Sequence, residues 1–124
     1  MKPETLEWVE VARHDLGAAR ALLDDGFYQG AVYYCQQAIE KLLKAIWTER
    51  HGVGTHPRTH NLVKLADALA IAPPSHLARL LNELTDQIFP SRYPERGWRY
   101  ERAVAEEYCR MTEGLYEWLQ QLLI

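Results

Sequence analysis

The chain has 124 residues, of which 48% are hydrophobic and 25% are charged, and its formal net charge at neutral pH is −3. This composition is typical of a single globular domain over residues 1–124, and it excludes the disordered and fibrous classes of protein. The acidic balance also argues against a general nucleic-acid coat protein, because such proteins are normally basic.

Cysteine usage and the N-terminus indicate where the protein works. Cys35 and Cys109 both fall within helical patterns and lack metal-ligand spacing, so we interpret them as small core residues in a reducing compartment. The charged N-terminus has no apolar signal-peptide segment, and no stretch reaches the roughly 20 apolar residues of a membrane span. We therefore expect a cytoplasmic protein.

The first predicted helix covers residues 3–24, with Pro3 in its first turn. Its apolar residues recur at spacings of three and four: Val9, Ala12, Leu16, Ala19 and Leu23. Gly26 follows as a natural left-handed cap. Because only a few residues separate this helix from the next one, we expect the two to form an antiparallel hairpin.

The clearest helical pattern covers residues 28–47. At about 100° per residue, its apolar side chains fall within one arc of roughly 160°, which predicts the central helix of a bundle. The other side of the helix carries a polar ridge made of Gln36, Gln37, Glu40, Lys41 and Lys44. This ridge is either a solvated face or a polar groove or subunit interface.

Loops and caps predict three further helices. A loop over residues 51–59 precedes a short helix over residues 60–70, with Thr59 as its cap. Two prolines end that helix, and Ser75 caps a fourth helix with a leucine-rich face. A second loop covers residues 89–98, where two prolines and a glycine interrupt the helical pattern.

The last predicted helix covers residues 99–123 and carries one apolar stripe: Tyr100, Val104, Tyr108, Met111, Leu115, Trp118 and Leu122. No strand pattern appears along the chain. The sequence therefore predicts an all-α, up-and-down four-helix bundle with one additional short helix.

Histidines near the first loop invite a metal interpretation, which their spacing does not support. Pro57 separates His56 from His60, so the two cannot share a regular helical face, and no carboxylate is placed to complete a metal site. Nucleophile and phosphate-loop motifs are also missing. We predict no metal, no cofactor and no catalytic residue, and we interpret His60 as a helix-start residue that bonds backbone groups or contacts a ligand.

An arginine-rich segment is the strongest candidate for ligand binding. Guanidinium groups bind phosphate in bidentate fashion, and aromatic rings offer stacking surfaces for bases. This combination suits a nucleotide or RNA, although neighbouring glutamates could instead neutralise the arginines in surface ion pairs. The residues concerned are Arg92, Tyr93, Arg96, Arg99 and Arg102, together with Trp98 and Tyr100.

The order of these features resembles the HEPN domain family (higher eukaryotes and prokaryotes nucleotide-binding). Its most specific parts are the polar identities between Gln36 and Ala45, the His60-x-Leu62-x-x-Leu65 start of the third helix, and the run from Arg92 to Pro94. The resemblance covers nearly the whole chain. It implies a small, stand-alone prokaryotic all-α protein that forms a homodimer or higher homo-oligomer.

The resemblance also implies a partner and a possible activity. Relatives are often encoded beside a minimal nucleotidyltransferase, with which they form a toxin–antitoxin pair. Many relatives are metal-independent ribonucleases that carry Arg-x(4–6)-His near the start of the last long helix.

This chain departs from the ribonuclease motif, because no histidine follows His76. Arg50 and His56 have the right separation but lie at the first loop, and without an imidazole the mechanism lacks its acid–base group. We therefore favour a non-catalytic binding module. The alternatives are a degenerate ribonuclease that uses Arg50, His56 or Tyr93, and a structural oligomerisation subunit.

Overall fold

The computed structural model describes residues 1–87 and 99–123, and within these ranges it contains helices and no strand. The predicted all-α fold is therefore confirmed. The helices are α1 (Pro3–Asp24), α2 (Tyr28–His51), α3 (Leu62–Ala68), α4 (Ser75–Gln87), α5 (Arg102–Gln120) and the 3-10 helix η2 (Gln121–Leu123).

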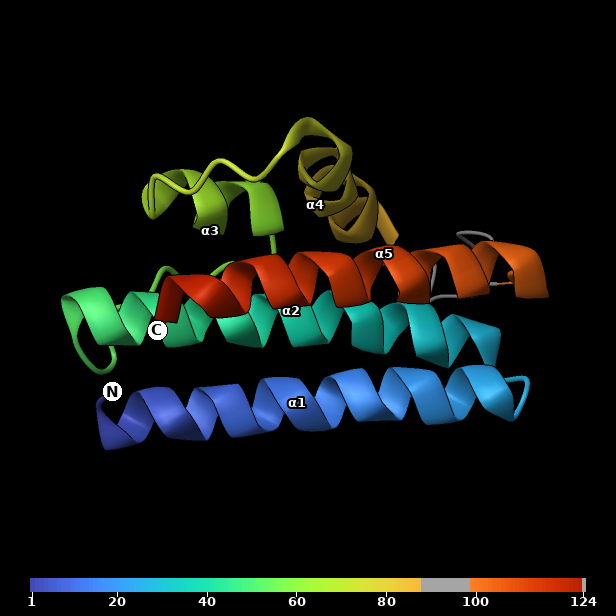
Figure 1. Cartoon of the computed structure of the whole chain (residues 1–124), viewed down its shortest axis with the longest axis horizontal. Coiled ribbons are helices and arrows are strands. Elements are labelled where there is room, and N and C mark those ends of the chain that lie inside the picture. The colour runs from blue at the N-terminus through green and yellow to red at the C-terminus, as the bar shows by residue number, and fades with distance from the viewer. Residues whose placement is uncertain (88–98, 124) are drawn as a thin grey trace.

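The three long helices α1, α2 and α5 run along the long axis of the molecule (Figure 1). The two shorter helices, α3 and α4, lie together on the side of the bundle away from α1, where they contact α2. In this view α4 is seen nearly end-on, so its axis is steeply inclined to those of the long helices. The helix α2 contacts every other helix of the bundle, as expected for its central element.

The predicted hairpin of α1 and α2 is built on a glycine cap. Gly26 has φ +85°, a left-handed conformation that costs glycine little. This conformation lets the Phe27 N–H donate to the Leu22 carbonyl at 2.8 Å and the Gly26 N–H donate to the Leu23 carbonyl at 3.2 Å. The two bonds satisfy carbonyls at the end of α1 in the Schellman pattern. The prediction of Gly26 as a left-handed cap is confirmed.

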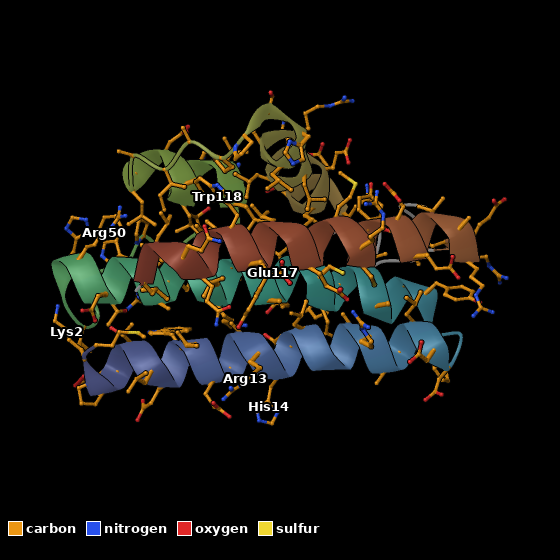
Figure 2. The ribbon with its side chains drawn as sticks, viewed as in Figure 1. Lys2, Arg13, His14, Arg50, Glu117 and Trp118 are labelled. Atoms are coloured by element: carbon orange, nitrogen blue, oxygen red, sulfur yellow. The ribbon has the colours of Figure 1, made fainter. Side chains whose placement is uncertain are left out.

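Polar contacts also join the opposite end of the hairpin. The backbone N–H of Lys2 and the hydroxyl of Thr5 each donate to Glu49 Oε1 at 2.9 Å. Lys2 Nζ also donates to the carbonyl oxygens of Thr48 and Glu49, and Figure 2 shows Lys2 beside the end of α2. With both ends joined, the register of α1 on α2 is fixed.

The apolar arc predicted on α2 forms the centre of the core. Its members are all fully buried: Ala31, Val32, Cys35, Ala38, Ile39, Leu42, Leu43, Ala45 and Ile46. They pack against leucines of α3 and α4 and against α5. The predicted core face of this helix is therefore confirmed.

The third helix is shorter than predicted. It begins at Leu62 instead of residue 60, because the side chain of Asn61 accepts a hydrogen bond from the Lys64 N–H at 3.1 Å and acts as the N-cap. Thr59 was the predicted cap, but its hydroxyl instead accepts from the Asn61 N–H. This later start of the helix leaves His60 in the loop and able to turn toward α2.

The buried face of α5 differs from the predicted stripe. Val104 and Leu122 are exposed, whereas the buried residues are Ala105, Cys109, Thr112, Leu115, Tyr116 and Leu119. Three of these side chains are small, and small side chains at a contact allow two helices to approach closely. The prediction gave weight to the large apolar residues and therefore rotated the face.

Candidate functional site

A buried carboxylate, Glu40, lies at the centre of the most connected polar cluster among the described residues. Its Oε1 accepts from Gln36 Nε2 at 3.0 Å and lies 2.9 Å from His60 Nδ1, and its Oε2 accepts from Lys44 Nζ at 2.8 Å. Only 2% of Glu40 is exposed. We call Gln36, Glu40, Lys44 and His60 the Glu40 cluster.

Helix geometry and one loop bring these four residues together. Gln36, Glu40 and Lys44 follow each other at four-residue intervals on α2, and residues at this spacing share one face of a helix. The fourth member arrives because the Gln36 amide also donates to the backbone carbonyl of His60 at 3.0 Å. Two contacts, one to the backbone and one to the ring, therefore hold His60 against α2.

The surroundings of Glu40 keep it ionised. Burial alone would raise the pKa of this carboxyl, but hydrogen bonds from Lys44, Gln36 and His60 outweigh burial and hold the pKa below its usual value. An ionised carboxylate can only accept hydrogen bonds, so Nδ1 of His60 carries a hydrogen and donates a hydrogen bond to Glu40. The carboxylate therefore fixes both the tautomer and the orientation of the imidazole.

One side of the cluster continues to α1 through aromatic contacts. Lys44 Nζ lies 5.7 Å from the ring centroid of Trp8, a cation–π distance. Trp8 in turn packs edge-on against His56, with ring centroids 5.5 Å apart. Burial, together with the positive charges of Lys44 and Arg58, lowers the pKa of His56. The surroundings of His56 thus favour its neutral form.

The other side of the cluster also reaches α1, through polar residues of the predicted ridge. Gln37 donates to Gln36 at 2.6 Å, and Lys41 donates to Gln37 at 2.8 Å. Lys41 Nζ also lies 3.4 Å from Asp15 on α1. The ridge is therefore one connected hydrogen-bond network.

The prediction of a solvated ridge is wrong for Gln36, Glu40 and Lys44, which are all buried by the chain itself. Whether the ridge also faces a partner subunit stays a prediction. The network includes two residues that the sequence reasoning missed, Trp8 and Asp15. Both lie on α1, and no local spacing links them to α2.

His60 is the exposed member of the cluster. Its side chain is 64% exposed although Nδ1 is bonded to a buried carboxylate, so the rest of the ring is available to a ligand. An oriented imidazole of this kind can donate a hydrogen bond or exchange a proton. The structure thus brings together His60, predicted as a ligand contact, and the ridge of α2, predicted as a groove or subunit interface.

The predicted arginine-rich segment is only partly described. Arg92, Tyr93 and Arg96 lie outside the described residues. Arg99 is exposed, and Arg102 is the first residue of α5, where its Nε donates to Glu106 at 2.8 Å. This ion pair is the arrangement expected if neighbouring glutamates neutralise the arginines.

Tyr100 is turned toward the bundle. Its hydroxyl is hydrogen-bonded to Gln87, at the end of α4, over 2.5 Å, and burial raises the pKa of this phenol to about 12. At least one aromatic side chain of the segment therefore packs against the fold and does not offer a free stacking face.

Arg50 and His56, the one pair with ribonuclease-like spacing, serve different parts of the fold. Arg50 Nη1 donates to the Leu69 carbonyl at 2.9 Å, near the end of α3 (Figure 2), whereas His56 packs on Trp8 of α1. Each side chain is therefore held by a different helix.

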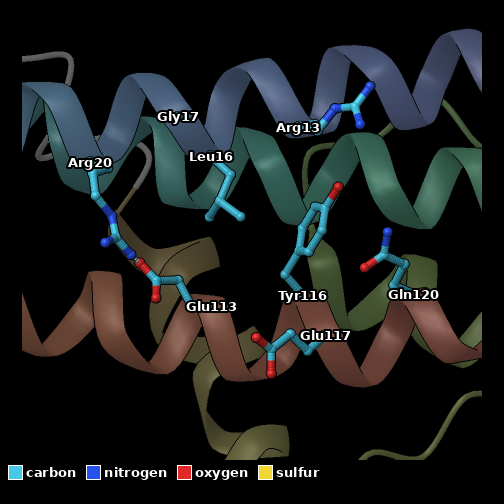
Figure 3. Close-up of a pocket in the computed structure, with 8 residues that line it drawn as sticks. All are labelled: Arg13, Leu16, Gly17, Arg20, Glu113, Tyr116, Glu117 and Gln120. Atoms are coloured by element: carbon cyan, nitrogen blue, oxygen red, sulfur yellow. Dashed lines mark ion pairs between the residues drawn. The ribbon is translucent and has the colours of Figure 1, made fainter.

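A groove of about 500 Å³ lies between α1 and α5 (Figure 3). Arg20 pairs across it with Glu113, and Arg13 pairs with Glu10 of its own helix. Arg13 and Arg20 are balanced by Glu113 and Glu117 in the lining of the groove. It therefore has no excess positive charge for a phosphate, and it contains none of the predicted ligand residues.

Two classes of feature are not found within residues 1–87 and 99–123. No group of three or more His, Cys, Asp or Glu side chains is placed to hold a metal ion. No helix in these ranges is long and apolar enough to cross a membrane.

The fold and the cluster define a small helical-bundle protein. Comparison with known families shows to which family it belongs. The HEPN domain family matches residues 5–122, so the chain belongs to the HEPN family. The resemblance to this family noted from the sequence is confirmed.

Two solved structures match over nearly their full lengths. TT1696 from Thermus thermophilus is 27% identical with a TM-score of 0.82, and ST0689, described as an archaeal HEPN homologue, is 26% identical with a TM-score of 0.76. In both cases the match covers 98% of this chain and 99% of the other. A comparison with curated proteins gives no match.

Proposed function

We propose that this chain is a non-catalytic HEPN module that acts as the partner of a minimal nucleotidyltransferase in a toxin–antitoxin-like pair. In this proposal it contacts a nucleotide or RNA through Arg92, Arg96, Arg99 and Arg102, and the ridge of α2 positions the surrounding fold. Membership of the HEPN family supports the class of the module. The partner and the ligand are inferred from the family.

One observation carries the non-catalytic part of the proposal. No histidine follows His76, so the arginines near the start of the last helix have no histidine at the spacing of the ribonuclease motif, and Arg50 and His56 are held by different contacts. The ribonuclease mechanism of relatives needs an arginine and an imidazole that act together. This chain has no arginine and histidine at that spacing near the start of its last helix.

Titration with ATP and with short single-stranded RNAs tests the ligand. If the arginines contact phosphate, Arg102→Ala weakens binding and reduces the salt dependence of the affinity by about one phosphate contact. Arg110→Ala is the matched control, because Arg110 lies two turns further along α5 and pairs with Glu107 much as Arg102 pairs with Glu106. No heat signal at millimolar ligand would remove the ligand part of the proposal.

Co-expression with nucleotidyltransferases of the same genome tests the partner. We expect a complex that elutes as one species in size-exclusion chromatography. Separate elution of the two proteins would contradict the partnership and leave the ligand test unaffected.

A second candidate function is a degenerate, metal-independent ribonuclease, and the geometry of His60 favours it. A buried carboxylate orients this imidazole, and such a histidine can accept a proton from a ribose 2′-hydroxyl. This candidate predicts RNA cleavage that persists in chelator and disappears in His60→Ala. Intact RNA after long incubation with the wild-type protein would exclude it.

A further inference from the structure

Two cysteines meet in the core of the bundle. Cys35 on α2 and Cys109 on α5 are 74 residues apart in sequence, yet their Sγ atoms lie 3.6 Å apart. Both are free thiols; Cys35 is fully buried and Cys109 is 5% exposed. A disulfide bond is about 2.05 Å long, so the two sulfur atoms must move less than about 2 Å closer together to form one.

The contact makes the two thiols chemically unequal. The Cys35 thiol donates its hydrogen to Cys109 Sγ. This hydrogen bond raises the pKa of Cys35 well above its usual value, since it holds the proton in place, and burial adds to the effect. The same bond lowers the pKa of Cys109 because it stabilises the thiolate. Cys109 is also the more exposed of the two thiols, at 5% against 0% for Cys35, so peroxide reaches it first. We therefore assign Cys109 as the nucleophile of the pair, since the thiolate is the reactive form.

We propose that Cys109 and Cys35 form a peroxide-sensitive pair that closes into a disulfide between α5 and α2. In the first step the Cys109 thiolate attacks hydrogen peroxide, so that an S–O bond forms, the O–O bond breaks and hydroxide leaves. Cys109 is then a sulfenic acid. In the second step Cys35 sulfur attacks Cys109 sulfur and forms the S–S bond. The S–O bond of the sulfenic acid breaks, and its hydroxyl group leaves as water with the proton of Cys35. One peroxide has then accepted two electrons from the two thiols.

Closure would join the last helix to the central helix through a covalent bond. The bond would close a loop from residue 35 to residue 109, which contains most of α2 and all of α3 and α4, and it would start next to Gln36 of the Glu40 cluster. A closed loop of this length restricts the unfolded chain strongly. The inference is independent of the proposed ligand and partner, because it rests on the position of two core thiols.

Intact-protein mass spectrometry after treatment of dilute native protein with hydrogen peroxide tests the proposal. We expect a monomer that has lost the mass of two hydrogen atoms, migrates faster in non-reducing gels and returns to its original state with dithiothreitol. Two thiols that still react with iodoacetamide after denaturation would overturn the proposal. So would a disulfide that joins two chains.

The dependence of the closure rate on urea concentration distinguishes oxidation of the native protein from oxidation of the unfolded chain. If the thiols meet in the folded bundle, the rate of closure is unchanged by urea below the unfolding transition. A rate that rises with urea throughout this range would show that the pair reacts only after opening, and the proposal would fail.

Single variants test the assigned order of the steps. In Cys35→Ser the sulfenic acid on Cys109 cannot be resolved, so dimedone should label Cys109. In Cys109→Ser we expect Cys35 to remain unlabelled. Circular dichroism of both variants checks that they fold, and the wild-type urea experiment stands if either one does not. Labelling of Cys35 alone would contradict the assignment of Cys109 as nucleophile.

Discussion

His60 donates from Nδ1 to Oε1 of Glu40 over 2.9 Å, although the two residues are 20 positions apart and a loop separates them. The carboxylate is shielded from solvent, while most of the imidazole is exposed. The contact joins the loop before α3 to the centre of α2. Glu40 therefore stabilises the fold at the point where the loop presents an oriented and exposed imidazole.

Replacement of Glu40 by alanine should destabilise the fold severely. The change leaves Lys44 buried without its carboxylate, and breaking a buried ion pair in this way typically costs about 3–5 kcal/mol. We expect a corresponding loss in the free energy of unfolding measured by urea denaturation. Glu107→Ala is the control, because its ion pair with Arg110 is exposed and should contribute little. Equal stability of the two variants would show that the Glu40 cluster does not support the fold.

Low pH should destabilise the fold, in part because Glu40 becomes protonated. The pKa of this carboxyl is lower in the folded state than its ordinary value. Its contribution to stability is therefore complete above the unfolded-state pKa and is lost as pH falls through the folded-state pKa. Urea midpoints between about pH 6 and pH 2 should fall more steeply for the wild type than for Glu40→Gln. Parallel profiles would contradict the assignment.

The helices and the buried face of α2 could be predicted from the sequence, because hydrophobic periodicity indicates which side of a helix is buried. The burial of the α2 ridge and the buried face of α5 could not be predicted in this way. Glu40 and Lys44 are charged, so their pattern indicates solvent. Their burial is compensated by their own ion pair and by Gln36 within α2, and also by contacts with His60 and Trp8 from distant parts of the chain. Those contacts join distant parts of the chain and leave no periodic signal.

A core position on α2 provides a direct test of the packing. Leu42 is fully buried, and Leu42→Ala should cost about 2–5 kcal/mol, from lost burial and the cavity that remains. Leu6→Ala on α1 is the matched control, since Leu6 is half exposed and surface substitutions usually change stability by less than about 0.5 kcal/mol. Urea denaturation of both variants gives the comparison. A cost below about 1 kcal/mol at Leu42 would contradict its place in the core.

The side chain of Arg50 should stabilise the fold. Its guanidinium donates to the Leu69 carbonyl, so Arg50→Ala removes a charged hydrogen bond at the end of α3 and should cost about 1 kcal/mol. Arg58→Ala, in the neighbouring loop, is the control, and we expect it to be nearly neutral. If instead Arg50→Ala keeps full stability and abolishes RNA cleavage, Arg50 belongs to the degenerate ribonuclease of the second candidate function.

The ends of α1 and α3 predict a pair of substitutions with opposite effects. Both ends form the Schellman pattern: at α3 the Ile71 N–H donates to the Ala66 carbonyl and the Ala70 N–H donates to the Asp67 carbonyl. The left-handed position is Gly26 after α1, but it is Ala70, with φ +55°, after α3.

An alanine in the left-handed conformation costs roughly 1–2 kcal/mol, because its Cβ approaches the following carbonyl oxygen. Ala70→Gly should therefore stabilise the protein by about 1 kcal/mol, after the greater entropy of an unfolded glycine is subtracted. Gly26→Ala should destabilise it by a similar amount, because the added Cβ meets no atom from elsewhere in the fold within 4 Å and the local backbone conformation alone causes the effect. Thermal denaturation of the two variants should shift the melting temperature in opposite directions. A shift of the same sign in both would mean that one of the two helix ends does not adopt the left-handed cap.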